Sequence, residues 1–147
     1  MTRYKSKTLA TGLALLGGSL GLHRFYLHGG RDLLAWLHPL PTLAGLVGVQ
    51  RMLDLGQDDR VAWLLLPLLG LMLAQAALCA IVYGLLPDER WDARHNPGAA
   101  VHATGWGPVL GVITALIVGA TALMATIAFS GQRYFESQVE EGRKISQ

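Results

Sequence analysis

Four apolar blocks, separated by short polar segments, constrain this chain more than any other feature. They cover residues 8–22, 33–53, 61–86 and 108–129. Within each block the apolar residues follow one another instead of recurring along one helix face, which is typical of helices that have lipid as their solvent. The pattern predicts an all-α, polytopic membrane protein with a bundle of four transmembrane helices.

Composition agrees with a membrane protein and excludes one class of partner. The chain is 52% hydrophobic and 15% charged, whereas a soluble domain has roughly 25% charged residues. Its net charge of +2 is small, and it has no basic stripe or arginine-rich run of the kind that binds nucleic acid. The expected partner is therefore the lipid bilayer, with no nucleic acid.

The first block has fifteen residues, about 22 Å as a helix, which is too short for hydrocarbon about 30 Å thick. Continuing the helix through residues 23–27 brings it to about 30 Å. Phe25 and Tyr26 then lie among the lipid headgroups, where aromatic side chains gather, and Arg24 extends its charge to water. We therefore predict one continuous, uncleaved first span over residues 8–27.

Prolines interrupt the second block. Pro39 and Pro41 each remove a backbone donor and disfavour helix at the preceding residue. A short segment over residues 33–38, a break and a helix from about 41 to 55 are therefore expected. The expected caps between this helix and the next are Gly56 and either Asp58 or Asp59.

Positive charge predicts the orientation, because cytoplasmic segments of membrane proteins are enriched in Lys and Arg. With four spans and the N-terminus inside, the inner segments hold eight such residues and the outer segments four. This bias predicts that both termini are cytoplasmic, in a bacterial inner membrane. The inner residues are Arg3, Lys5, Lys7, Arg51, Arg60, Arg133, Arg143 and Lys144, and the outer ones are Arg24, Arg31, Arg90 and Arg94.

Three regions are expected from this arrangement. Residues 1–56 are expected to form a two-helix hairpin domain, and residues 57–131 a second pair of transmembrane helices with an outer loop at 87–107. Residues 132–147 are expected to be a short cytoplasmic tail. We expect no internal repeat along the chain.

Small residues recur at spacings of three or four on three of the predicted spans, where they let helix backbones approach closely. Two arrangements use such faces: packing within one compact bundle, or association into a homo-oligomer. The residues are Ala10, Ala14 and Gly18 on the first span, Gly70, Ala74 and Ala77 on the third, and Gly111, Ala115 and Gly119 on the fourth.

Charged residues surround two adjacent glycines between the first two blocks. If the chain turns there, Gly29 and Gly30 supply positive φ angles, and the turn brings Asp32 back toward Arg24. One hypothesis is that this pair latches the hairpin at the lipid–water boundary. The other is that Arg24 contacts a partner or an anionic ligand.

The residues before this turn resemble the TM2 domain family, in which two transmembrane helices are joined by a motif of the form Gly-x-x-Gly-x-(Asp or His)-Arg-Phe-Tyr-Leu-Gly. The resemblance covers about residues 5–54, with His28 in place of the last glycine. It implies a membrane-embedded hairpin that acts as an interaction or signalling module, with no established reaction. The matching residues are Gly18, Gly21, His23, Arg24, Phe25, Tyr26 and Leu27, with Asp54 where the second helix closes.

The segment between the third and fourth blocks contains the remaining candidates for chemistry. Asp88, Asp92 and His95 share one face if this segment is helical, which makes them weak candidates for a surface metal site. A solvated interfacial helix with Trp91 directed toward lipid is the alternative. The sequence contains no catalytic triad, phosphate loop or paired intramembrane carboxylates, so we expect neither enzymatic activity nor a cofactor.

The predicted function is an integral membrane interaction, scaffold or signalling module without catalytic activity, whose partner is an unknown membrane protein. The alternative is a small ion channel or transporter subunit formed by oligomerisation. A proton-sensing role for His23 is also chemically reasonable, because histidine titrates near neutral pH.

Overall fold

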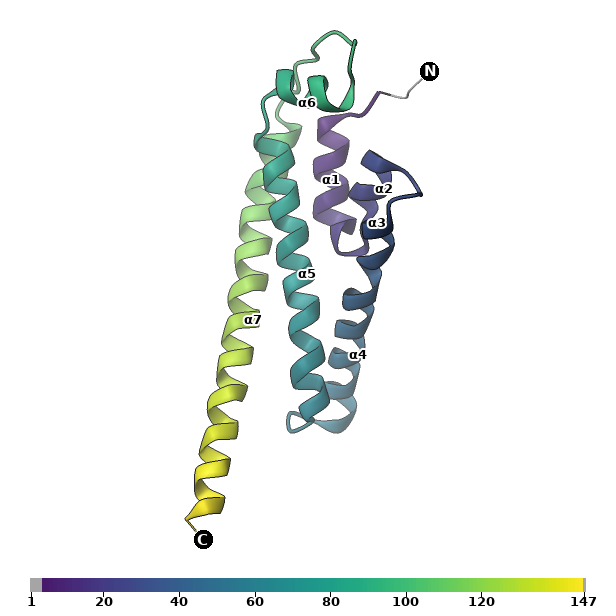
Figure 1. Ribbon diagram of the computed structural model, residues 1–147. Coiled ribbons are helices and arrows are strands. Elements are labelled where there is room, and N and C mark those ends of the chain that lie inside the picture. The colour runs from purple at the N-terminus through teal and green to yellow at the C-terminus, as the bar shows by residue number, and fades with distance from the viewer. Residues whose placement is uncertain (1–3, 147) are drawn as a thin grey trace.

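A computed structural model describes residues 4–146, and every regular element in that range is helical (Figure 1). Short turns connect most of the elements, and a longer loop over residues 96–106 connects α6 to α7. The elements are α1 (Lys7–Gly17), the 3₁₀ turn η1 (Gly18–Leu20), α2 (Leu22–His28), α3 (Leu33–Leu37), α4 (Pro39–Leu55), α5 (Arg60–Leu85), α6 (Asp88–His95) and α7 (Gly107–Ile145).

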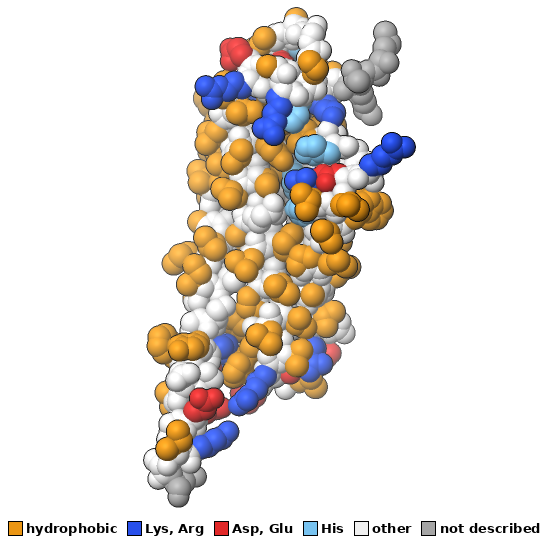
Figure 2. Space-filling model, viewed as in Figure 1, with side chains coloured by type: hydrophobic (Ala, Val, Ile, Leu, Met, Phe, Trp, Pro, Cys, Tyr) orange, Lys and Arg blue, Asp and Glu red, His pale blue; other side chains and the backbone are white. Residues whose placement is uncertain are grey.

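Three helical segments are long and apolar enough to cross a membrane: Leu33–Leu55, which joins α3 and α4, then Arg60–Leu85 and Gly107–Ile145. Hydrophobic side chains cover the middle of the visible face, while charged side chains gather toward its two ends (Figure 2). With 39 residues, α7 is about 58 Å long, and its last turns project beyond the α4–α5 turn (Figure 1). The expected tail is therefore the continuation of this helix.

The first apolar block does not form the continuous helix that the sequence predicted. α1 ends at Gly17, and the chain reverses through η1 and Gly21, so that α2 runs back beside α1. The backbone N–H of Ser6 donates to the hydroxyl of Tyr26 at 2.8 Å, which places the end of α2 beside the start of α1. The prediction of a first span over residues 8–27 is wrong, because the glycines permit a reversal where hydropathy alone indicates continuity.

Gly21 shows the physical reason for this reversal. Its φ of 79° lies in the left-handed region, which residues with a Cβ adopt only at a cost of about 1–2 kcal/mol. A Cβ added there would lie 2.5 Å from the carbonyl oxygen of Ala35. The close approach of α2 to α3 therefore requires glycine at this position.

The reversal changes the expected topology from four candidate spans to three. The N-terminal segment lies beside α6, where the backbone N–H of Lys5 donates to the Asn96 side chain at 2.7 Å. The other end of the bundle holds the α4–α5 turn and the last turns of α7, where Arg133 donates to Gln57 at 3.2 Å. The described ends of the chain therefore lie at opposite ends of the bundle (Figure 1), not at the same end as the four-span arrangement required.

The capping predictions are confirmed, whereas the predicted break is reduced to His38, whose φ of −58° and ψ of −41° are helical. α3 ends before His38, and α4 begins at Pro39, two residues earlier than expected, because the first turn of a helix tolerates proline. Gly56 caps α4 with a φ of 87°. Asp59, and not Asp58, caps α5 by accepting hydrogen bonds from the N–H groups of Val61 and Ala62.

Small residues pack the helices closely, with α5 in contact with α1, α4 and α7. The buried core between α1, α5 and α7 includes Ala14, Ala77 and Ala115. A Cβ added to Gly119 would lie 2.6 Å from the Cβ of Ala77, and one added to Gly111 would lie 2.7 Å from Thr11. Packing of these faces within one bundle is therefore confirmed.

We expect Gly119→Leu to lower the free energy of unfolding in detergent by about 1–3 kcal/mol, because the larger side chain forces α5 and α7 apart. Leu116→Ala on the same helix is the control, because Leu116 is 53% exposed and should change stability by less than about 0.5 kcal/mol. Equal thermal stability of the two variants would contradict the packing described here.

Candidate functional site

The turn between α2 and α3 is closed by an ion pair. The Nε of Arg24 donates to Oδ2 of Asp32 at 2.9 Å, and Oδ1 of Asp32 accepts from the N–H of Leu34 at 3.0 Å. The predicted pairing of Arg24 with Asp32 is therefore confirmed. Of the two glycines in the turn only Gly29 has a positive φ, so the expectation for Gly30 is wrong.

A second turn, between α4 and α5, has the same construction. Arg51 forms two hydrogen bonds with Asp59, from Nε at 2.7 Å and from Nη2 at 3.0 Å. The turn contains Gly56 with a φ of 87°. The indole of Trp63 donates to the carbonyl of Gln57 at 2.7 Å, just as Trp36 donates to Gly30 in the first turn at 2.9 Å.

The two turns are copies of one sequence repeat with a period of 27 residues, so the expectation of no internal repeat is wrong. One turn precedes the first candidate span and the other follows it, so the copies run in opposite directions along the bundle (Figure 1). The signal that reveals them is Arg-x4-Gly-x2-Asp-x2-Ala-Trp-Leu. The matching pairs are Gly18 and Gly45, Gly21 and Gly48, Arg24 and Arg51, Gly29 and Gly56, Asp32 and Asp59, Ala35 and Ala62, Trp36 and Trp63, and Leu37 and Leu64.

The repeat separates structural residues from residues specific to the first turn. Arg24 and Asp32 have counterparts with the same hydrogen bonds, so they serve to close a turn. Residues that differ between the copies are the candidates for a role that the first turn has and the second turn lacks. Among these differences are His23 against Gln50, Phe25 against Met52, Tyr26 against Leu53, and His28 against Leu55.

His23 is the most buried of these differing residues, with 1% of its surface exposed, whereas Gln50 is exposed. Its ring lies edge-on to His38, with centroids 5.6 Å apart, and 5.8 Å from the ring of Tyr83. Its Nδ1 atom is buried and has no hydrogen-bond partner among the described residues. His23 on α2 therefore points between α5 and the junction of α3 and α4.

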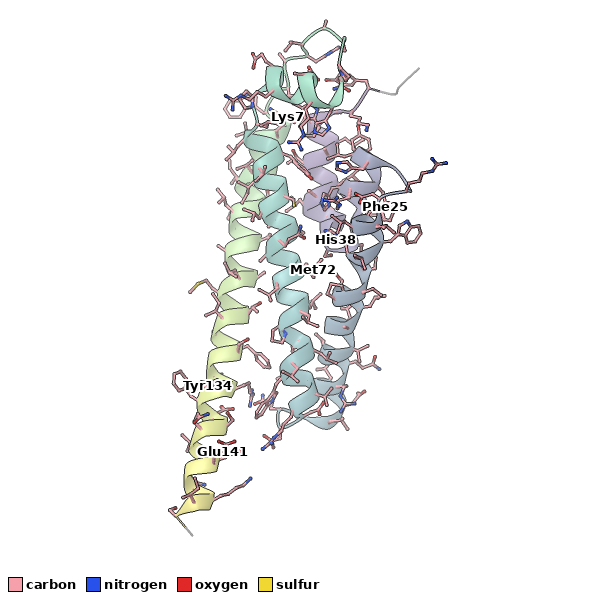
Figure 3. All side chains as sticks on the ribbon, viewed as in Figure 1. Lys7, Phe25, His38, Met72, Tyr134 and Glu141 are labelled. Atoms are coloured by element: carbon pink, nitrogen blue, oxygen red, sulfur yellow. The ribbon has the colours of Figure 1, made fainter. Side chains whose placement is uncertain are left out.

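The motif residues do not converge on one binding surface. Phe25 lies at the outer edge of the hairpin (Figure 3), where its ring packs edge-on against Trp36 at 5.1 Å. Tyr26 accepts a hydrogen bond from the N-terminal segment, while Leu27 is 3% exposed and packs in a cluster with Trp91. The motif therefore positions several contacts of the fold. Asp54, which the resemblance singled out, is exposed at the end of α4. Arg51, three residues earlier, pairs with Asp59 instead.

The residues predicted as weak candidates for a surface metal site instead contact other groups of the protein. Asp88 accepts from the Lys7 ammonium at 2.6 Å and from the hydroxyl and N–H of Thr104. Asp92 accepts from the Asn96 side chain at 2.7 Å and from the N–H of His102 at 2.9 Å, and His95 stacks on a tryptophan. Within residues 4–146, no group of three or more His, Cys, Asp or Glu side chains is placed to hold a metal ion.

The Lys7–Asp88 contact makes the packing of α6 sensitive to acid. The hydrogen bonds that Lys7 and then Thr104 donate lower the pKa of the Asp88 carboxyl from 3.8 to about 2. Because the folded-state pKa lies below the ordinary value, the stabilisation of about 2 kcal/mol is complete above about pH 4 and is lost as the pH falls through 2. Thermal unfolding in detergent should show this loss in the wild type. Asp88→Asn should be less stable at pH 6 and should lack this part of the acid dependence; an unchanged pH profile would contradict the assignment.

A groove of about 370 Å³ between α5 and α7 is the most apolar cavity described. Small and apolar residues of both helices line it, including Ala77, Ala115 and Gly119. Gln75 is its polar residue; Nε2 donates to the sulfur of Cys79 one turn along α5, while Oε1 is buried without a hydrogen-bond partner among the described residues. Among the described residues, Gln75 therefore makes no interhelical hydrogen bond.

No protein-family model, curated protein or solved structure matches this chain. The resemblance to the TM2 domain family therefore stays a prediction that rests on the motif residues. The geometry described above supplies the arguments for function.

Proposed function

We propose that α3–α4, α5 and α7 cross a bilayer and that the α1–α2 hairpin enters it and returns on the same side. Exposed leucines on these helices support contact with lipid; Leu64 is 77% exposed and Leu40 61%. Irregular backbone within a membrane is tolerated where protein covers it. The hairpin turn meets this condition, because the hydroxyl of Thr42 donates to the carbonyl of Ser19 at 2.6 Å.

Charge favours an orientation with the N-terminal end of the bundle in the cytoplasm, in a bacterial inner membrane. With three spans, that end holds six of the Lys and Arg residues among residues 4–146 and the opposite end five, and the richer side faces the cytoplasm. The six are Lys5, Lys7, Arg24, Arg31, Arg90 and Arg94, and the five are Arg51, Arg60, Arg133, Arg143 and Lys144.

In this arrangement the protein acts as a non-catalytic interaction module. Its α5–α7 groove binds a transmembrane helix of a partner protein. The observation that carries this proposal is the buried, unpartnered Oε1 of Gln75 in an otherwise apolar groove. A polar oxygen without a partner is costly in the membrane interior. Because Oε1 is buried in the isolated chain, a docked helix removes that cost by donating a hydrogen bond once the Gln75 amide turns toward the groove. The small residues of the groove let such a helix approach closely.

The chemistry of the partner follows from the groove. Its helix carries small residues on one face and a Ser, Thr, Asn or Gln side chain at the depth of Gln75. Each interhelical hydrogen bond of this kind contributes about 1 kcal/mol. Specificity therefore comes from the combination of close backbone packing and one donor.

Site-specific crosslinking in native membranes tests this proposal. A photoreactive residue at Leu116, which lines the groove, should capture one discrete partner, and Gln75→Leu should reduce the yield several-fold. The same residue at Val118, which is 44% exposed and lies about 160° around α7, is the control and should not capture it. Equal capture from both positions, or capture unaffected by Gln75→Leu, would contradict docking in the groove. A product of twice the chain's mass would identify a second copy as the docked partner.

A further inference from the structure

A second pocket between α5 and α7 lies at the end of the bundle that holds the α4–α5 turn, and we call it the C-terminal pocket. Its volume is about 500 Å³. Figure 3 labels Tyr134 and Glu141 in this part of α7. The lining of the pocket includes Arg60, Trp63, Leu64, Ser130, Arg133 and Glu141.

The pocket changes character along the bundle. Arg60 and Glu141 lie nearest the end, whereas Leu64, one turn further along α5, lies toward the apolar middle. In a membrane, the charged end of the pocket lies at the level of the lipid headgroups and the apolar end lies in the hydrocarbon. The shape therefore suits an amphipathic ligand that carries charge at one end and an apolar chain at the other.

Arg133 is a buried cation in the wall of this pocket, with 8% of its surface exposed. Its guanidinium lies 5.4 Å from the ring of Trp63 and 5.5 Å from that of Phe129. Two of its nitrogens donate, to Glu136 at 2.7 Å and to Gln57 at 3.2 Å, while Nε is buried without a partner among the described residues. The side chain is thus held in place, and because Nε is buried, Arg133 offers a ligand its positive charge and not this N–H.

Both basic and acidic side chains lie around the C-terminal pocket. Arg60 is 72% exposed along its side chain and lies 4.0 Å from Glu140, and Glu141 lines the pocket. Near the two arginines there are therefore three carboxylates, counting Glu136, which is paired with Arg133. A ligand with negative charge alone meets repulsion here, whereas a ligand with a phosphate and a cationic group has a complement for each.

We propose that the C-terminal pocket binds a phospholipid whose headgroup carries a phosphate and a primary ammonium, as phosphatidylethanolamine does. The phosphate binds near Arg60 and Arg133, with the Ser130 hydroxyl as a further donor. The ammonium donates to Glu141, and an acyl chain lies over Leu64. A choline headgroup has no N–H to donate, and the face of Trp63 that would attract it is already covered by Arg133.

Native mass spectrometry of the purified full chain tests this site. The protein is mixed in detergent with equal amounts of phosphatidylethanolamine, phosphatidylcholine and phosphatidylglycerol that have the same acyl chains. The ethanolamine adduct should exceed the choline adduct about tenfold, since one charge-assisted hydrogen bond separates them. Arg60→Gln and Glu141→Gln should each remove most of this preference, and neither removes a buried side chain.

Glu89→Gln is the matched control, because it removes the same charge from an exposed side chain of α6, at the other end of the bundle. It should keep the ethanolamine preference. Equal retention of ethanolamine and choline lipids by the wild type, or preference for phosphatidylglycerol, would overturn the proposal. An equal loss of preference in Glu89→Gln and Glu141→Gln would also overturn it, because the effect would then report general charge and not this pocket.

Discussion

Gly21→Ala should lower the free energy of unfolding in detergent by about 2–5 kcal/mol, which makes it among the most damaging single substitutions in the chain. Two costs add at this position. The left-handed φ of 79° costs a residue with a Cβ about 1–2 kcal/mol. The added Cβ would also lie 2.5 Å from the backbone oxygen of Ala35, and relief of such a clash costs about 1–3 kcal/mol.

Two other glycines separate these costs. Gly29 has a φ of 81° but open space around it, so Gly29→Ala should cost about 1–3 kcal/mol from backbone strain alone. Gly30 has neither a positive φ nor a close neighbour, so Gly30→Ala should change stability by less than about 0.5 kcal/mol. Reversible unfolding of the three variants should rank them in this order. A Gly21→Ala protein as stable as Gly30→Ala would show that α2 does not fold back against α3.

Trp91→Ala should lower the free energy of unfolding by about 3–5 kcal/mol, the usual cost of truncating a buried tryptophan. Trp91 is 1% exposed. Its indole N–H donates to the carbonyl of Lys5 at 2.8 Å, and its ring packs against Tyr83. The side chain thus connects α6 to the N-terminal segment and to α5.

Two controls make this prediction specific. Trp91→Phe keeps most of the packing and loses the hydrogen bond, so it should cost less than Trp91→Ala. Trp106 is 77% exposed, and Trp106→Ala should be nearly neutral. The thermal stability of the purified variants measures all three. A small effect of Trp91→Ala would instead support the sequence-based interpretation that Trp91 is directed toward lipid, which contradicts the burial described here.

The sequence correctly predicted an all-helical fold, but it did not predict that the backbone reverses within the first apolar block. Continuous apolar blocks report that a segment avoids water, but they do not report whether the backbone runs on or reverses. In the first block the difference rests on Gly17, Gly18 and Gly21, whose missing side chains allow close contacts with α2, α3 and α5. Those contacts are tertiary, so hydropathy could not reveal them.

The candidate site shows a similar division. The Arg24–Asp32 pair was predictable, because its members lie eight positions apart with two glycines between them. The second latch, between Arg51 and Asp59, was equally visible in the sequence once the 27-residue repeat is aligned. The roles of Gln75 and Arg133 were not predictable, because each depends on which polar atoms remain without a partner after the helices pack.

The central claim is that three helices cross the membrane and that the N-terminal hairpin returns to the side from which it entered. Labelling of single cysteines by a membrane-impermeant maleimide tests it most directly, in right-side-out and inverted vesicles and in a Cys79→Ser background. Cysteines at Gly30 and Gly98 should react on the same side as a tag at the N-terminus, and one at Ser146 on the opposite side. A cysteine at Gly30 that reacts on the side opposite the N-terminal tag would show that the first block crosses the membrane, and would contradict the re-entrant hairpin.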